Sequence, residues 1–224
     1  MVLFATGLLA FVGYYYGYRF LLLRNYLLAF EWWIIGISAS NMFIYQAAGV
    51  ETSGYIAAFL DAFSRSIGIP LIALVGLMKA INGYEPSKST DILMFVFGGV
   101  VAGVLLFVPA GQAVSPYVLL AATVGYCLFA FWLSGLLFRA GKHLISICFI
   151  LVTCLSIGIA AIYDFWEIPS DATNVFFNFY TLAQLVWAAG FALTYYVYTS
   201  LLASRQPASR NEASLVGGKA TNSY

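Results

Sequence analysis

One acid and one base, Asp61 and Arg65, are the residues whose types and spacing point most directly to chemistry. Both lie inside an apolar run over residues 54–79 that carries no other charge before its last residue. An isolated charge at the centre of a bilayer costs between about 2.5 and more than 10 kcal/mol, so it persists only when paired or facing a polar interior. Asp four residues before Arg is the favourable order for a pair on one helix. The pair therefore predicts either a path for a solute, ion or proton, or a hydrogen-bonded link between helices.

A polar stripe is predicted in the apolar run 26–48. Spacings of seven, three and four residues place four polar side chains on one helix face: Glu31, Ser38, Asn41 and Tyr45. Glu31 follows Arg24 by seven residues, which puts it about 10 Å into the membrane from the cytoplasmic side. Two readings stay open for Glu31: a functional carboxylate inside the bundle, or a side chain that extends back to Arg24 or the lipid headgroups.

Two later apolar runs carry similar stripes. Their polar residues are Ser146, Thr153, Ser156 and Tyr163 in one run, and Asn174, Asn178, Thr181 and Gln184 in the other. The simplest arrangement points all the stripes toward one another. Glu31 is then expected near the cytoplasmic third of the membrane, Arg65 near the middle and Asp61 toward the outer third. Such a ladder can relay protons or gate a solute cavity.

The composition predicts an all-α, polytopic membrane protein. Hydrophobic residues make up 62% of the 224 residues and charged residues 8%, against about 25% charged in soluble domains. Seven segments are apolar and long enough to span a bilayer: 2–22, 26–48, 54–79, 92–110, 115–138, 143–164 and 173–202. We expect one seven-helix domain over residues 1–203 and a disordered cytoplasmic tail over residues 204–224.

The charges of the connecting segments predict the orientation. One set of connections and the C-terminal tail hold nine Lys and Arg residues: Arg19, Arg24, Lys79, Lys88, Arg139, Lys142, Arg205, Arg210 and Lys219. The other set holds no Lys or Arg, only the acidic residues Glu51, Asp164, Glu167 and Asp171 and an uncharged turn over residues 110–116. The positive-inside rule then places the N-terminus outside and the C-terminus in the cytoplasm. We expect a bacterial inner membrane, with no removable signal peptide.

Several classes of function are disfavoured by composition. The single histidine, His143, and the three cysteines, which all fall in apolar runs, offer no ligand set for a haem or a His-rich metal site. The net charge of +1 disfavours nucleic acid as a partner. An enzyme is disfavoured because the sequence pairs no nucleophile with a base.

Three short features stand out in the apolar runs: Gly36-Ile37-Ser38-Ala39-Ser40-Asn41, Pro70 near the charged pair, and Gly190-Phe191-Ala192-Leu193 in the last run. Together with the seven-segment topology, they resemble the microbial rhodopsin family. In that family a lysine of the last helix carries retinal, with a carboxylate one turn earlier. The matching positions here are Ala188 and Gln184, and the counterion position falls on Ser64. The resemblance therefore implies the fold, but it predicts neither covalent retinal nor any other cofactor.

A second resemblance is to the sugar transporters built from two three-helix repeats joined by a linker helix. An offset of 118 residues superposes Arg24 on Lys142 and Tyr45 on Tyr163. Parallel repeats of this kind are a known transporter architecture. The Pro-Gln signature of that family is absent from this sequence.

Two hypotheses of function follow from these residues. The first is a retinal-independent seven-helix protein that transports or conducts a small solute, ion or proton, with the path lined by Asp61, Arg65, Glu31, Asn41, Ser38, Tyr45, Asn178 and Gln184. The second is a membrane sensor or accessory subunit that binds an apolar ligand or a partner membrane protein. Beyond the lipid bilayer, the further association we expect is with a membrane-protein partner or in a homo-oligomer.

Overall fold

The computed structural model describes residues 1–166, 168 and 178–219, with side chains up to Arg205. In chain order the helices are α1 (Val2–Leu22), α2 (Tyr26–Ala48), α3 (Glu51–Phe63), η1 (Ser64–Ala73), α4 (Leu74–Asn82), α5 (Lys88–Phe107), α6 (Pro109–Arg139), α7 (His143–Tyr163) and α8 (Phe179–Lys219). The helices α3, η1 and α4 form one uninterrupted segment over Glu51–Asn82. The all-α prediction is confirmed.

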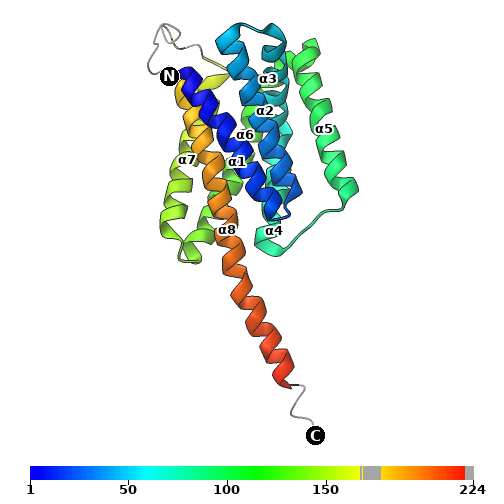
Figure 1. Cartoon of the computed structure of the whole chain (residues 1–224), viewed down its shortest axis with the longest axis vertical. Coiled ribbons are helices and arrows are strands. Elements are labelled where there is room, and N and C mark those ends of the chain that lie inside the picture. The colour runs from blue at the N-terminus through cyan, green and yellow to red at the C-terminus, as the bar shows by residue number, and fades with distance from the viewer. Residues whose placement is uncertain (167, 169–177, 220–224) are drawn as a thin grey trace.

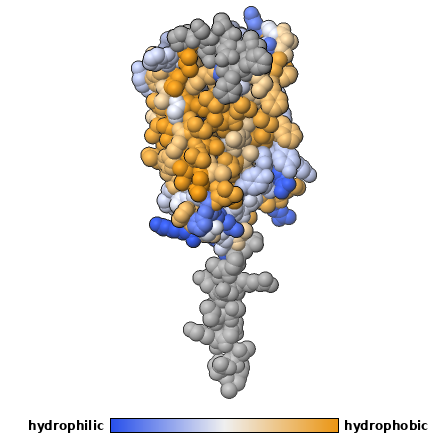
Figure 2. Space-filling view, turned by 90° about the vertical axis from the view of Figure 1, so that its left-hand side faces the viewer, coloured by the Kyte–Doolittle hydropathy of each residue, from blue (hydrophilic) through white to orange (hydrophobic). Residues whose placement is uncertain are grey.

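Six helical segments of the described chain are long and apolar enough to cross a membrane: α2, the segment from α3 to α4, α5, α6, α7 and Phe179–Arg205 of α8. Figure 2 shows the corresponding surface, an apolar band between two more polar ends. The chain is therefore an integral membrane protein. Helix α1 has 21 residues, enough for a span, but its tyrosines and Arg19 make it less apolar than the other six.

The helices pack as a ring. The start of α1 and the end of α8 lie at opposite ends of the molecule (Figure 1). Around the ring, α1 contacts α2, α2 contacts α3 and η1, η1 contacts α6, α6 contacts α7, α7 contacts α8, and α8 returns to α1. Helix α5 lies outside the ring, against α3, η1 and α6. The ring therefore encloses an interior that α5 does not reach.

Two glycines allow α1 and α2 to pack closely. A Cβ atom on Gly13 would lie 2.6 Å from the backbone nitrogen of Gly36, and a Cβ atom on Gly36 would lie 3.2 Å from the backbone nitrogen of Tyr14. Small residues at such crossings let helix backbones approach inside a membrane. The α1–α2 pair is therefore held by direct backbone packing.

The η1 segment is a ten-residue π-helix with Pro70 inside it. Proline has no N–H group, so the carbonyl five residues earlier, that of Arg65, lacks its π-helical hydrogen-bond donor. π-Helical backbone is rare, and its usual single-turn form is found frequently at functional sites. The segment lies where α2, α5 and α6 all contact the chain.

Two boundaries differ from those predicted from the sequence. The predicted turn over residues 110–116 is wrong: α6 begins at Pro109, which occupies the first turn where its missing N–H costs nothing, and the helix also contains Pro116. The described part of the last helix begins at Phe179, directly after Asn178, and the predicted start near residue 173 lies outside the described residues. Helix α8 stays helical to Lys219 and projects beyond the bundle (Figure 1), over residues where the sequence predicts a disordered tail.

Candidate functional site

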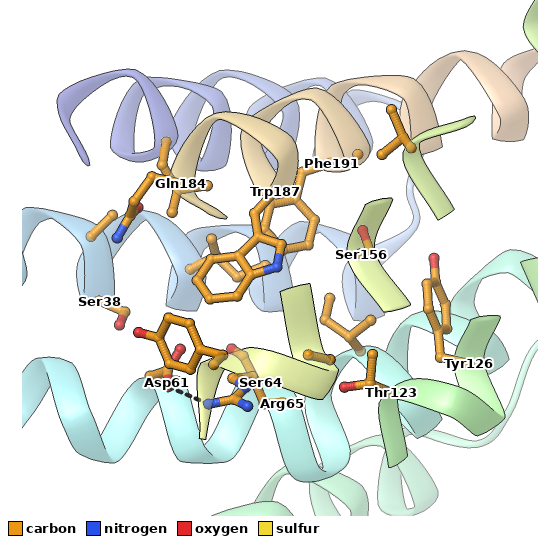
Figure 3. Close-up of a pocket in the computed structure, with 18 of the residues that line it drawn as sticks. Ser38, Asp61, Ser64, Arg65, Thr123, Tyr126, Ser156, Gln184, Trp187 and Phe191 are labelled. Atoms are coloured by element: carbon orange, nitrogen blue, oxygen red, sulfur yellow. Dashed lines mark hydrogen bonds and ion pairs between the residues drawn. The ribbon is translucent and has the colours of Figure 1, made fainter. Parts of the chain in front are cut away.

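A cavity of about 300 Å³ lies inside the ring of helices (Figure 3). Its wall contains side chains from α1, α2, α3, η1, α6, α7 and α8. Asp61, Ser64 and Arg65 lie on one wall, and the α8 residues Gln184, Trp187 and Phe191 lie on the opposite one. The Trp187 indole extends from α8 toward Asp61 and Arg65. The Asp61–Arg65 pair thus faces an internal space.

The Arg65 guanidinium is the centre of the charged end of the cavity. Its Nη1 atom donates to Asp164 Oδ1 at 3.1 Å, and Nη2 donates to Asp164 Oδ2, so the pair is bidentate. Nη1 also lies 3.5 Å from Asp61 Oδ2. The Arg65 Cζ atom lies 4.9 Å from the centroid of the Tyr163 ring, within the range of a cation–π contact. Two carboxylates therefore surround one guanidinium, and the cluster carries a formal charge of −1.

The two carboxylates of this cluster are held differently. The Asp164 side chain is 16% exposed and forms both of the short bonds to Arg65. The Asp61 side chain is 37% exposed, lines the cavity and makes one long contact with Arg65. Asp164 therefore fixes Arg65 in place, whereas Asp61 offers a carboxylate to whatever occupies the cavity.

Several hydroxyl groups on the cavity wall are already satisfied by backbone carbonyls. Ser38 donates to Ala57 O at 3.0 Å, Thr123 to Leu119 O at 2.9 Å and Thr153 to Phe149 O at 2.7 Å. In contrast, Ser64 Oγ and Gln184 Oε1 are buried and have no hydrogen-bond partner among the described residues. Beside Asp61, Ser64 and Gln184 are therefore two wall residues with polar atoms left for a ligand or water.

Glu31 lies behind the η1 wall of the cavity. Its side chain is fully buried, and neither carboxyl oxygen has a hydrogen-bond partner within the described residues. The carboxyl packs directly on Gly68 of η1, where an added Cβ atom would collide with it. The Ser64 side chain faces the same carboxyl. Since Ser64 also lines the cavity, it stands between the cavity and Glu31.

The structure brings four of the eight predicted path residues to the cavity wall: Ser38, Asp61, Arg65 and Gln184. It places three others elsewhere. Asn41 donates to Ile37 O of its own helix at 2.9 Å. Tyr45 is 44% exposed and its ring covers Gly54. Asn178 accepts from the Thr181 N–H at 2.8 Å, which caps the start of α8.

The stripes on the later helices divide in the same way. Thr153, Ser156 and Tyr163 of α7 line the cavity, whereas Ser146 donates to Ser134 O at 2.8 Å. The predicted residue Asn174 lies outside the described part of the chain. The stripes of α2, α7 and α8 therefore reach the cavity with only some of their residues. In each stripe another residue makes a hydrogen bond to nearby backbone instead.

The sequence interpretation missed the main partner of Arg65. From the sequence alone, Asp164 belongs to a connecting segment. It directly follows Tyr163, the last residue of the α7 stripe, and this neighbour is the one sequence feature that indicates a position close to Arg65. Tyr126 and Thr123 of α6 were also missed, because α6 shows no polar stripe in the sequence.

Comparison of the chain with protein-family models, with curated proteins and with solved structures finds no match.

Proposed function

We propose that this integral membrane protein binds a small solute, ion or proton in the cavity and moves it across the bilayer. The observation that carries the proposal is that Asp61 and Arg65 line an internal cavity of about 300 Å³ while Asp164 pairs with Arg65. Ionisable groups inside membranes are costly, and where they face an interior cavity they mark substrate or ion pathways. The excess of one carboxylate in the cluster favours a cation or a proton over an anion.

The proposed topology has seven spans, with the N-terminus outside and the C-terminus in the cytoplasm. Two observations support counting α1 as a span: it runs beside α2 and α8, and the start of α1 and the end of α8 lie at opposite ends of the molecule (Figure 1). The nine basic residues on one side support the orientation. The proposed location is a bacterial inner membrane. We also propose a distant relationship to the microbial rhodopsins.

In this mechanism Asp61 binds the transported species and Arg65 sets the affinity. Asp61 is the carboxylate open to the cavity, while Asp164 holds the guanidinium beside it. A bound cation or proton on Asp61 would weaken its attraction to Arg65. Loss of the Arg65–Asp61 contact, with Arg65 still paired to Asp164, then distinguishes two states of the site, one loaded and one empty.

Flux measurements on proteoliposomes test this function. The purified protein is reconstituted, a gradient is imposed, and uptake is followed for protons, alkali cations and small neutral solutes. We expect Asp61→Asn and Arg65→Ala to lower the flux of the transported species by about tenfold or more, equivalent to at least about 1.4 kcal/mol. If both variants fold and every flux equals that of the wild type, the proposal is wrong.

A surface ion pair provides the matched control. Lys79 Nζ lies 2.8 Å from Glu85 Oε1 in the connection before α5, and Glu85 is 65% exposed. The hydrogen bond and the positive charge of Lys79 lower the pKa of Glu85, so the pair is formed at neutral pH. Glu85→Gln also removes one ion-pair carboxylate, but far from the cavity. We expect it to leave the flux unchanged.

A second function is supported by the apolar part of the cavity wall. Trp187, Phe191, Pro70 and Ile69 surround a space suited to an apolar ligand. In that case the protein would be a sensor or an accessory subunit without flux. A stoichiometric small molecule or membrane-protein partner that copurifies, together with no flux in proteoliposomes, would favour this function.

A further inference from the structure

Glu31 is a second ionisable group of the interior, and it does not line the cavity. Its side chain is 0% exposed, and both carboxyl oxygens lack a hydrogen-bond partner among the residues described. A buried carboxylate that is ionised and unpaired would be strongly unfavourable in a membrane. The neutral, protonated form is the state that such surroundings favour.

The neighbours of Glu31 contain no compensating charge. From η1, the Ser64 hydroxyl and the backbone at Gly68 face the carboxyl. Arg65, the next residue along η1, turns its guanidinium to Asp61 and Asp164 instead. Within α2 itself, the residues one turn away are apolar or small: Leu27, Leu28, Ile34 and Ile35. Glu31 therefore cannot be explained as one half of an ion pair within the described structure.

The position of Glu31 connects it to the cavity through one residue. Ser64 Oγ is buried, has no partner in the described part of the chain, lines the cavity and faces Glu31. A hydroxyl can both donate and accept a hydrogen bond. Ser64 can therefore pass a proton between water in the cavity and the Glu31 carboxyl.

The backbone beside Glu31 offers a hydrogen-bond acceptor for water. Glu31 packs on Gly68 of the π-helix η1, and Pro70 in the same helix leaves the Arg65 carbonyl without a π-helical donor. A carbonyl that lacks this donor can accept a hydrogen bond from water. On the cytoplasmic side, Leu27 and Leu28 are buried between Glu31 and Asn25. About 9 Å of helix separates Glu31 from Asn25, where the polar residues resume.

We infer that Glu31 is the inner proton-binding site of the pathway, loaded from the cavity through Ser64 and emptied toward the cytoplasm. This inference rests on the proposed transport function and identifies the proton as the transported or coupled ion. In each cycle an excess proton on cavity water (H₃O⁺) passes to Ser64 Oγ while the hydroxyl proton of Ser64 passes to an oxygen of the ionised Glu31 carboxyl, so Ser64 stays a neutral hydroxyl. The Glu31 O–H bond later breaks, and the proton leaves to water on the cytoplasmic side past Leu27 and Leu28.

Infrared spectroscopy and proton uptake test the inference together. We expect the purified wild type to show a carboxylic-acid C=O band at neutral pH that shifts in D₂O. Glu31→Gln should remove that band and stop proton uptake into proteoliposomes. Ser64→Ala should keep the band but slow both the D₂O exchange and the uptake. Glu51→Gln, which removes an exposed carboxyl at the start of α3, is the matched control and should change neither measurement.

The outcomes separate this inference from the proposed function. If Asp61→Asn lowers flux while Glu31→Gln keeps both wild-type uptake and the band, the inference is overturned and the transport function stands. The same conclusion follows if the wild type moves a solute but no protons. If the wild type moves nothing, both fail. Should Glu31→Gln not fold, Glu31→Asp replaces it: the band should move in frequency, and an unchanged band overturns the inference.

Discussion

At the scale of single residues, Asp61 and Asp164 have different tasks around the same guanidinium. Asp164 forms the bidentate pair with Arg65, and Asp61 makes a single contact of 3.5 Å while facing the cavity. If Asp61 were its only partner, Arg65 could leave the site when Asp61 binds a cation or a proton. Because Asp164 also pairs with Arg65, the contact between Arg65 and Asp61 can break while Arg65 stays in the site.

This division predicts that the two aspartates contribute differently to stability. Asp164→Asn removes the carboxylate from a mostly buried, bidentate pair, for which losses of about 2–5 kcal/mol are typical. Asp61→Asn removes a long, partly exposed contact, and we expect it to cost less than about 1 kcal/mol. Unfolding in mixed micelles, followed by circular dichroism, measures both. A larger loss for Asp61→Asn than for Asp164→Asn would contradict the assignment.

The residue scale also shows what the sequence could predict of the site. The sequence criterion is that a polar group inside an apolar run is costly unless it faces a polar interior. The criterion selects four residues that line the cavity: Asp61, Arg65, Ser38 and Gln184. It also selects Asn41 and Asn178, which hydrogen-bond to nearby backbone, and Tyr45, which is exposed. Helical spacing shows which face a residue occupies, but it does not reveal a hydrogen bond to the same helix or a cap.

At the scale of helices, two departures from regular α-helix packing shape the interior. The π-helix η1 carries Arg65 and Ser64 and presents Gly68 to Glu31. The close α1–α2 crossing brings α1 against the ring that encloses the cavity. A proline inside a helix favours an irregular backbone at this position. The ten-residue π-helical run could not be predicted, because it depends on how α2, α5 and α6 pack against it.

The α1–α2 crossing predicts a strong effect from adding one methyl group. In Gly13→Ala the new Cβ atom would lie 2.6 Å from Gly36 N and 2.8 Å from Trp32 O, so the two backbones must separate. Overpacking of this kind costs about 1–3 kcal/mol. Gly99→Ala on α5 is the control, because a Cβ atom there meets nothing within 4 Å. We expect a lower unfolding temperature in detergent for Gly13→Ala alone, and equal temperatures for the two variants would contradict the described packing.

At the scale of the whole molecule, composition predicted most of the architecture. The apolar segments agree with the helices to within a few residues for α1, α2 and α7. They agree less well at the start of α6, where Pro109 begins the helix. Which helices enclose the cavity, and that α5 lies outside it, could not be predicted, because every segment of the chain is apolar on most of its faces.

The seven-span topology predicts the side of the membrane on which each exposed position lies. Single cysteines are introduced at Leu3, Glu51 and Lys88 in a chain whose three native cysteines have been replaced, and intact cells are treated with a membrane-impermeant thiol reagent. If α1 crosses the membrane, positions 3 and 51 lie on the outer side and react in intact cells, whereas position 88 reacts only after permeabilisation. Because α2 alone separates position 51 from the cytoplasmic connection between α1 and α2, a six-span chain with α1 on the inner surface would label position 51 but not position 3. Labelling of position 88 alone would reverse the orientation, and the proton released by Glu31 would then leave on the opposite side of the membrane.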